Sequence, residues 1–139
     1  MLKRFRKSIP YILFLYGIFF FTSTIAQSKD SLPYLKVKDP KFNFGTVTQG
    51  KVVEIEYTFE NTGKNPLTIS DIEVTCGCTV ADFPHYPIRQ GDSGMIMITF
   101  NTKDKYDKQD RTVKVISNAS NSPTKLRFYG HIEEDKSDK

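Results

Sequence analysis

Apolar and polar side chains alternate along Val52–Asn61, and this period of two constrains the fold more than any other feature of the sequence. The apolar members of the pattern are Val53, Ile55, Tyr57 and Phe59. In an extended strand successive side chains point to opposite faces, so the apolar residues share one face while Glu and Thr share the other. The segment therefore predicts a β-strand that buries one face.

Other short runs of similar pattern predict further strands: Tyr34–Val37, Phe42–Phe44, Leu67–Val74, Met95–Asn101, Arg111–Ser117 and Lys125–Ile132. Turn-forming Gly, Asn and Pro residues separate these runs. The alternation slips near Asp71, which predicts a β-bulge. The charged run Asp104–Arg111 is expected to be a hairpin loop. Because no stretch has a helical period, we predict an all-β, immunoglobulin-like antiparallel β-sandwich of about seven to eight strands.

The first 26 residues have the organisation of a secretory signal peptide. Basic residues precede an apolar stretch, Ile9–Phe21, and the small residues Thr24 and Ala26 fit a cleavage site. The apolar stretch is 13 residues long, whereas a membrane-spanning helix needs roughly 20. Cleavage is therefore favoured over retention as an anchor. We expect a periplasmic or secreted protein that is soluble after cleavage near Ala26.

Cleavage would also remove the positive excess of the chain. The sequence has 20 Lys+Arg and 16 Asp+Glu, a formal net charge of +4. The leader contains no acid and four basic residues, Lys3, Arg4, Arg6 and Lys7. Its removal leaves 16 basic against 16 acidic residues. A neutral domain lacks the basic footprint of a nucleic-acid-binding protein. We expect no nucleic-acid partner and no membrane insertion after cleavage.

The remaining chain has the size of one domain. We predict a polar, proline-containing linker at residues 27–33, the sandwich at residues 34–132 and a disordered charged tail at residues 133–139. A chain of this length can bury enough surface to fold without disulfide or metal staples.

Several short motifs resemble one bacterial family: FNFG at Phe42–Gly45, EIEYTFENTG at Glu54–Gly63, CGCT at Cys76–Thr79, TFN at Thr99–Asn101 and VISN at Val115–Asn118. The family is catalogued as domain of unknown function 1573 and is frequent in Bacteroidetes. It is similar to the domains shared by ASPM, SPD-2 and Hydin. The resemblance extends from Pro40 to Ile132. It implies a secreted or lipid-anchored immunoglobulin-like sandwich with no established activity.

Cys76-Gly77-Cys78 is the constellation that most suggests chemistry. A disulfide across it would close a three-residue loop, which the chain-entropy relation credits with only about 1.6 kcal/mol. Such a bond is a weak staple and, if strained, an easily reduced redox site. The glycine would permit unusual backbone angles in so small a ring. Two thiolates at this spacing could instead bind one soft ion, such as Zn²⁺ or Cu⁺.

The sequence leaves these alternatives open: packing cysteines or a plain disulfide, a redox site, and a metal site. The spacing does not bring His85 or His131 to the cysteines. His85 and Tyr86 also form a candidate contact patch between Pro84 and Pro87, in an exposed loop whose tyrosine could alternatively cover the sandwich end.

No catalytic motif such as G-x-S-x-G or H-E-x-x-H is present in the sequence. We therefore expect no enzymatic activity and no cofactor. The favoured function is that of an exported, non-catalytic domain of the cell envelope, which binds another envelope protein or has a structural role through its loops and edge strands. The alternative is a periplasmic thiol-redox or soft-metal-binding protein that acts through Cys76 and Cys78.

Overall fold

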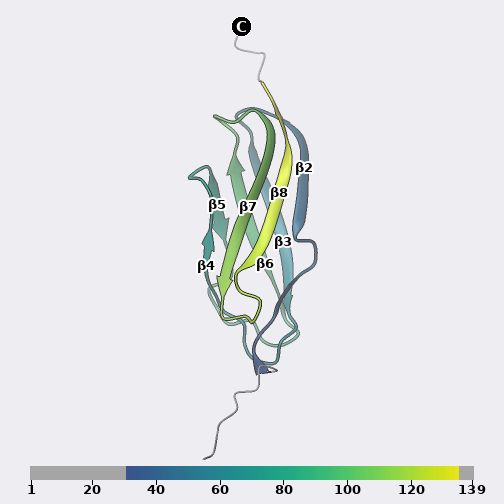
Figure 1. The fold of residues 1–139 in the computed structure, drawn as a ribbon, viewed down its shortest axis with the longest axis vertical. Helices are drawn as coiled ribbons and strands as arrows, with labels where there is room; N and C mark the ends of the chain where they lie inside the picture. The colour runs from purple at the N-terminus through teal and green to yellow at the C-terminus, as the bar shows by residue number, and fades with distance from the viewer. Residues whose placement is uncertain (1–30, 135–139) are drawn as a thin grey trace, which may run out of the picture.

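Eight strands form two four-stranded sheets in the computed structural model, which describes residues 31–134 (Figure 1). The strands are β1 (Leu35–Val37), β2 (Lys41–Thr48), β3 (Val52–Asn61), β4 (Ile69–Glu73), β5 (Thr79–Asp82), β6 (Ser93–Asn101), β7 (Asp107–Ser117) and β8 (Thr124–Glu133). One sheet has the order β1-β3-β6-β5 and the other β2-β8-β7-β4. This is the arrangement of a constant-type immunoglobulin sandwich with its first strand divided between the sheets. The predicted fold class is confirmed.

One strand pair departs from the antiparallel prediction. The chain leaves β1 in the first sheet and joins the second sheet as β2, which pairs with β8 in parallel. The other five pairs are antiparallel. The predicted antiparallel sandwich therefore has one parallel pair, at this edge. Alternation reports which side chains are buried, and it carries no information about the direction of the neighbouring strand.

The alternation of β3 sets one wall of the core. Its inward residues Ile55, Tyr57 and Phe59 are almost fully buried. They pair in register with β6, where Ile98 lies opposite Ile55 and Ile96 lies opposite Tyr57. Full burial of one such side chain stabilises the fold by about 1.5–3 kcal/mol. The period of two in this segment is therefore the direct cause of the sheet's inward face.

The second sheet supplies the opposite wall. Val113 and Val115 of β7 and Leu126 and Phe128 of β8 are all buried. Phe128 contacts Phe100 of β6 across the interior, with ring centroids 5.3 Å apart and ring planes inclined by 57°. Tilted aromatic pairs of this kind add to the energy of burial. The core thus lies between the two sheets along most of their length.

Several predicted boundaries change in the structure. β2 is longer than the predicted Phe42–Phe44, and β7 already begins at Asp107, so most of Asp104–Arg111 is strand rather than a hairpin loop. The inward residue Gln109 is buried there, and its amide donates a hydrogen bond to the Tyr106 carbonyl at 2.8 Å. Because this inward position is polar, the start of β7 lacks the apolar alternation by which a strand is recognised in the sequence. The bulge predicted near Asp71 is confirmed by a register shift between Ile69 and Asp71.

Residues 1–30 and 135–139 lie outside the described part of the chain, so the signal peptide, most of the linker and most of the charged tail stay predictions. Glu133, predicted to begin the tail, is the last residue of β8. No helix within residues 31–134 is long and apolar enough to cross a membrane.

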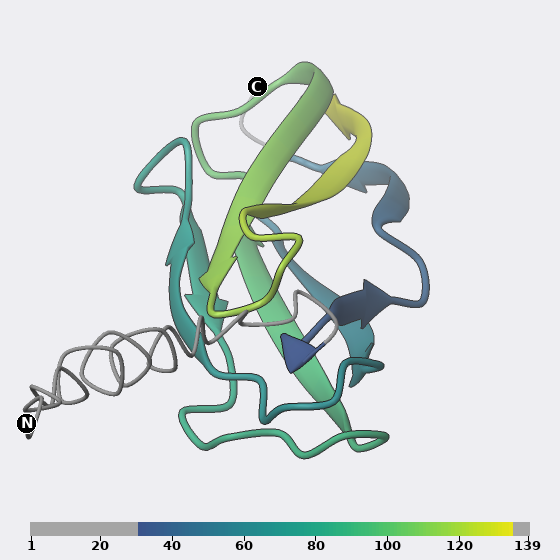
Figure 2. The ribbon, with the colours of Figure 1, turned by 60° about the horizontal axis from the view of Figure 1, so that its bottom comes forward.

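The connections place two edges of the sandwich together. β4 is an edge of one sheet and β5 is an edge of the other, and the chain passes from one to the other through residues 74–78. Figure 2 shows β4 and β5 (teal) on one side of the sandwich and β1 and β2 (blue) on the opposite side. The cysteine motif therefore forms a corner between the sheets.

Candidate functional site

Cys76 and Cys78 form a disulfide in the connection from β4 to β5. The Thr79 amide donates a hydrogen bond to the Cys76 carbonyl at 3.2 Å, which closes the turn within the motif. The Asn101 amide donates to the Cys78 carbonyl at 2.9 Å, which joins the turn to the end of β6. These backbone bonds hold the disulfide at one end of the sandwich.

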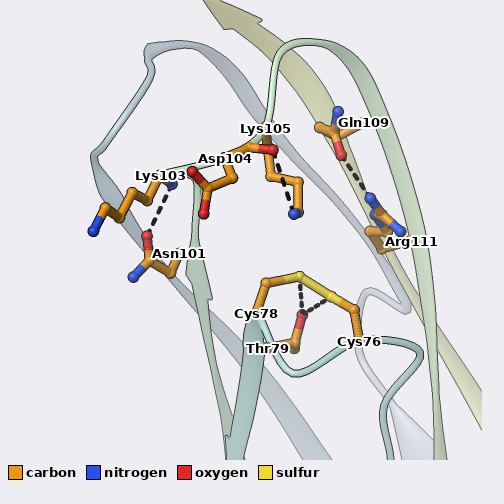
Figure 3. The surroundings of a disulfide bond; sticks show 9 residues. All are labelled: Cys76, Cys78, Thr79, Asn101, Lys103, Asp104, Lys105, Gln109 and Arg111. Carbon is orange, nitrogen blue, oxygen red and sulfur yellow. Dashed lines mark hydrogen bonds between the residues drawn. A yellow bond between two sulfur atoms is a disulfide. The ribbon is translucent and has the colours of Figure 1, made fainter.

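The buried hydroxyl of Thr79 lies beneath both sulfur atoms (Figure 3). Its Oγ1 is 3.7 Å from Cys76 Sγ and 3.9 Å from Cys78 Sγ. A hydroxyl can donate or accept at these weak sulfur contacts. The first strand residue after the motif thus supplies a polar group in contact with both sulfur atoms.

Cys78 is open to a shallow hollow of about 280 Å³ beside the loop that joins β6 to β7. The hollow is also lined by Gly77, Asn101, Lys103, Asp104 and Lys105. Figure 3 shows the three charged residues on this side of the disulfide. Two ammonium groups and one carboxylate make the hollow cationic.

Arg111 approaches the disulfide from β7, and Figure 3 draws it on the Cys76 side. It shares the inward-facing alternation of Val113 and Val115, but it lies beyond the apolar core. Its Nη2 donates to Gln109 Oε1 at 2.9 Å, whereas its Nε is buried and has no hydrogen-bond partner. The corner therefore combines a disulfide with an incompletely satisfied, inward-pointing cation.

Gly77 does not adopt the left-handed conformation that would require glycine. The glycines with positive φ among the described residues are Gly45, Gly50 and Gly91. A Cβ added at Gly77 would meet no atom within 4 Å. The expectation that the small ring needs the conformational freedom of this glycine is therefore wrong.

The histidines are not part of the cysteine corner. His131 Nδ1 lies 3.6 Å from Asp107 Oδ1, and the His85 ring packs on Phe83 with centroids 4.6 Å apart. Within residues 31–134 no group of three or more His, Cys, Asp or Glu side chains is placed to hold a metal ion. A disulfide sulfur is no thiolate ligand, so metal binding at Cys76 and Cys78 would require the reduced form.

The candidate contact residues His85 and Tyr86 follow β5, whereas the cysteine corner precedes it. The Tyr86 side chain is 64% exposed rather than packed over the sandwich end. Sequence reasoning missed Thr79 and Arg111 as parts of the corner. Arg111 had a usable signal, because it continues the inward register of the strand predicted at Arg111–Ser117.

Comparison with known proteins places this sandwich in a family. Residues 35–132 match the model described as protein of unknown function (DUF1573). The chain belongs to this family. The DUF1573 model covers all eight strands except the last residue of β8. No curated protein matches the chain.

Solved structures with little sequence identity share the fold of this DUF1573 domain. A protein of unknown function from Porphyromonas gingivalis W83 has a TM-score of 0.66 at 13% identity, over 78% of this chain and 51% of the other. The ASH/PapD-like domain 7 of human CEP192 has a TM-score of 0.58 at 12% identity, over 81% of this chain and 93% of the other. The chain thus spans about half of the Porphyromonas protein and nearly all of the CEP192 domain.

The Vibrio cholerae VesB protease also contains a similar region, with a TM-score of 0.52 at 15% identity over 76% of this chain and 32% of the protease. At these identities the likeness concerns the fold. The DUF1573 model is described as of unknown function, so the match identifies the family without naming an activity.

Proposed function

We propose that this DUF1573 domain is an exported protein-binding module of the cell envelope, and that it docks an extended segment of another envelope protein along the free edge of β5. The carrying observation is that β5 has neither the edge lysine of β1 nor the register irregularities of β2 and β4, which oppose such pairing. Strand addition to an exposed edge is a common mode of recognition by sandwich domains.

The other three edge strands carry recognisable protection. β1 is three residues long and exposes Lys36. β2 is interrupted by an irregularity between Asn43 and Gly45, and β4 by one between Ile69 and Asp71. Edge lysines and bulges discourage pairing with another chain. The sequence of β5, Thr-Val-Ala-Asp, has no lysine, proline or bulge.

The free edge of β5 offers both backbone and apolar groups. The Asn101 amide donates to the Cys78 carbonyl, and hydrogen-bonded pairs recur at every second residue of an antiparallel ladder. Val80 and Asp82 therefore bond to β6, and Ala81 presents its N–H and C=O to the free edge. Val80 is 65% exposed beside this edge.

The outer face of β5 carries one carboxylate next to this edge. Asp82 is exposed and forms no ion pair within residues 31–134, whereas the exposed glutamates of β3 are separated from the edge by β6. A strand added beside β5 would place alternate side chains beside Val80 and Asp82. We therefore expect a partner strand with an apolar residue opposite Val80 and a basic residue opposite Asp82.

The experiment uses displayed random peptides selected on the immobilised mature chain that begins at Gln27. Selected peptides should carry an apolar and a basic residue two positions apart, and in hydrogen-exchange measurements they should slow exchange of the Ala81 amide. Protection along β1 or β2 instead, or a failure to select any peptide, would count against docking at β5.

Val80→Lys tests the side-chain contact, with Val52→Lys as its matched control. Val52 lies on the same outer face and is 55% exposed, but it belongs to β3 and is removed from the β5 edge. An edge lysine opposes strand addition. Val80→Lys should weaken peptide binding at least tenfold, whereas Val52→Lys should leave it unchanged. Equal affinity of the two variants would contradict the proposal.

A second candidate function, thiol–disulfide exchange in the envelope, rests on the opening of Cys78 to the cationic hollow. The test is equilibration of the mature chain with glutathione buffers, followed by alkylation to count thiols and by metal analysis. Reduction within the range of these buffers supports exchange. A bond that persists in excess reduced glutathione contradicts it, and stoichiometric zinc or copper in the reduced sample would favour soft-metal binding.

A further inference from the structure

We infer that an incoming thiol attacks the disulfide at Cys78, that Cys76 leaves as a thiolate, and that Arg111 is the counter-ion of this thiolate. The inference rests on the second candidate function, thiol exchange at this corner, and adds a direction of attack and a positioning residue. Two independent features carry it: the hollow that Cys78 lines, and the unpartnered Nε–H of Arg111, which Figure 3 draws on the Cys76 side.

The direction of attack follows from the surroundings of the two cysteines. Cys78 lines the hollow, and Cys76 is not among the residues that line it. Lys103 and Lys105 flank this opening and would attract an anionic thiolate. An incoming thiol therefore reaches Cys78 Sγ first, and Cys76 becomes the leaving group.

The exchange balances with a dithiol as the reductant. A thiolate of the dithiol forms a bond to Cys78 Sγ, the Cys76–Cys78 bond breaks, and its electron pair leaves on Cys76 Sγ. The second thiol of the reductant then loses its proton and attacks the reductant's first sulfur, which is bonded to Cys78. This step closes the reductant's disulfide and releases Cys78. The domain gains two electrons as two thiol or thiolate groups, and the reductant becomes a disulfide.

Arg111 meets the requirement of the leaving group. The guanidinium stays protonated in proteins and presents five donors. One of these, Nε–H, is buried and without a hydrogen-bond partner, although buried polar groups are almost always paired. A thiolate at Cys76 would supply the missing acceptor. The Thr79 hydroxyl, 3.7 Å from Cys76 Sγ, is a second donor for the same charge.

A stabilised leaving thiolate has two measurable effects. It accelerates exchange, because a better leaving group departs faster, and it favours the reduced form, which makes the disulfide more oxidising. Arg111 acts here as a positioning and charge-stabilising residue that does not touch the incoming thiol.

The first experiment compares Arg111→Gln with Lys114→Gln in the mature chain. Lys114 lies on the same strand, is exposed and pairs with Glu73, so its loss controls for removal of one positive charge. Equilibration with dithiothreitol should show Arg111→Gln to be about tenfold harder to reduce, which corresponds to a potential about 30 mV more negative. Arg111→Lys, which keeps the charge, should restore part of the difference.

The second experiment needs no variant. The wild-type chain is treated with glutathione, trapped with an alkylating reagent and mapped by mass spectrometry. Glutathione should be found on Cys78 and the alkyl group on Cys76. The reverse assignment overturns the direction of attack, and an unchanged equilibrium in Arg111→Gln relative to Lys114→Gln overturns the role of Arg111. A wild-type bond that excess dithiothreitol cannot reduce would instead remove the second candidate function itself.

Discussion

Tyr57 of β3 donates a hydrogen bond from its phenol to the backbone carbonyl of Arg127 on β8, with 2.9 Å between the two oxygens. The bond crosses the interior from one sheet to the other. Burial also raises the pKa of Tyr57 above its ordinary value, because the charged phenolate would lose its hydration. One side chain thus ties the sheets together and makes their association sensitive to alkaline pH.

Tyr57→Phe should destabilise the domain by about 0.5–1.5 kcal/mol, the usual net contribution of an intramolecular hydrogen bond. The Arg127 carbonyl would lose this partner, while the ring would keep its packing in the core. Urea unfolding followed by circular dichroism measures the change. A variant as stable as the wild type would show that water replaces the lost donor.

Alkaline pH should destabilise the wild type more than Tyr57→Phe. The unfolded tyrosine ionises near pH 10, and the folded pKa is higher, so above about pH 10 the unfolded state binds fewer protons and its population rises with pH. The stabilisation is complete below the unfolded pKa and is lost as pH rises toward the folded one. Unfolding curves between pH 8 and about 11 should diverge for the two proteins, and parallel curves would contradict the assignment.

Gly130→Ala should lower the free energy of unfolding by about 1–3 kcal/mol, the usual penalty of overpacking. A Cβ at this position would overlap the Phe44 ring and the Gly45 carbonyl. The matched control is Gly77→Ala, whose Cβ enters open space and which should change stability by less than about 0.5 kcal/mol. Thermal unfolding of both variants, with thiol counting for Gly77→Ala, tests the contrast. Loss of the disulfide in Gly77→Ala would refute the view that its glycine is dispensable.

Replacing both Cys76 and Cys78 with Ser should lower stability by no more than about 1.6 kcal/mol, because the bond closes a three-residue loop. The variant should still fold, since the core lies between the sheets rather than at the corner. Urea unfolding and peptide binding at β5 are the measurements. A collapse of the fold would give the disulfide a structural role that its loop length does not provide.

Export should yield a mature chain that begins at Gln27. The basic, apolar and small-residue segments of the leader predict cleavage after Ala26. Intact-mass measurement of the natively expressed protein distinguishes the products. A mass that includes the leader, together with recovery in the membrane fraction, would support the alternative of an anchor.

The parts of the fold that alternation could reveal were predictable. β3 and β6 place apolar residues on one face in strict alternation, and the structure buries those faces. β5 is four residues long and lies between a turn and a proline-rich loop, so its period was too short to detect. β7 begins with the polar inward residues Gln109 and Arg111, which are hydrogen-bonded to each other at the end of the sandwich. Their polarity breaks the apolar alternation, so the start of this strand was not predicted.

The candidate site was predictable only in its cysteines. Residue spacing raised the Cys76–Cys78 disulfide as one of several alternatives, and it gave no means of choosing among them. Arg111 and Lys105 reach the corner from β7 and from the preceding loop, far from the cysteines in sequence. Such proximity depends on which strands become neighbours, and that is a property of the complete topology.

The parallel pairing of β2 with β8 has a mechanical consequence. The two strands run side by side in the same direction, so tension that draws the start of β2 and the end of β8 apart acts along the strands. All the hydrogen bonds between them would then be sheared at once, instead of opening one after another from an end. Because the ends of this pair lie at opposite ends of the sandwich (Figure 1), the division of the first strand gives the fold resistance to being stretched.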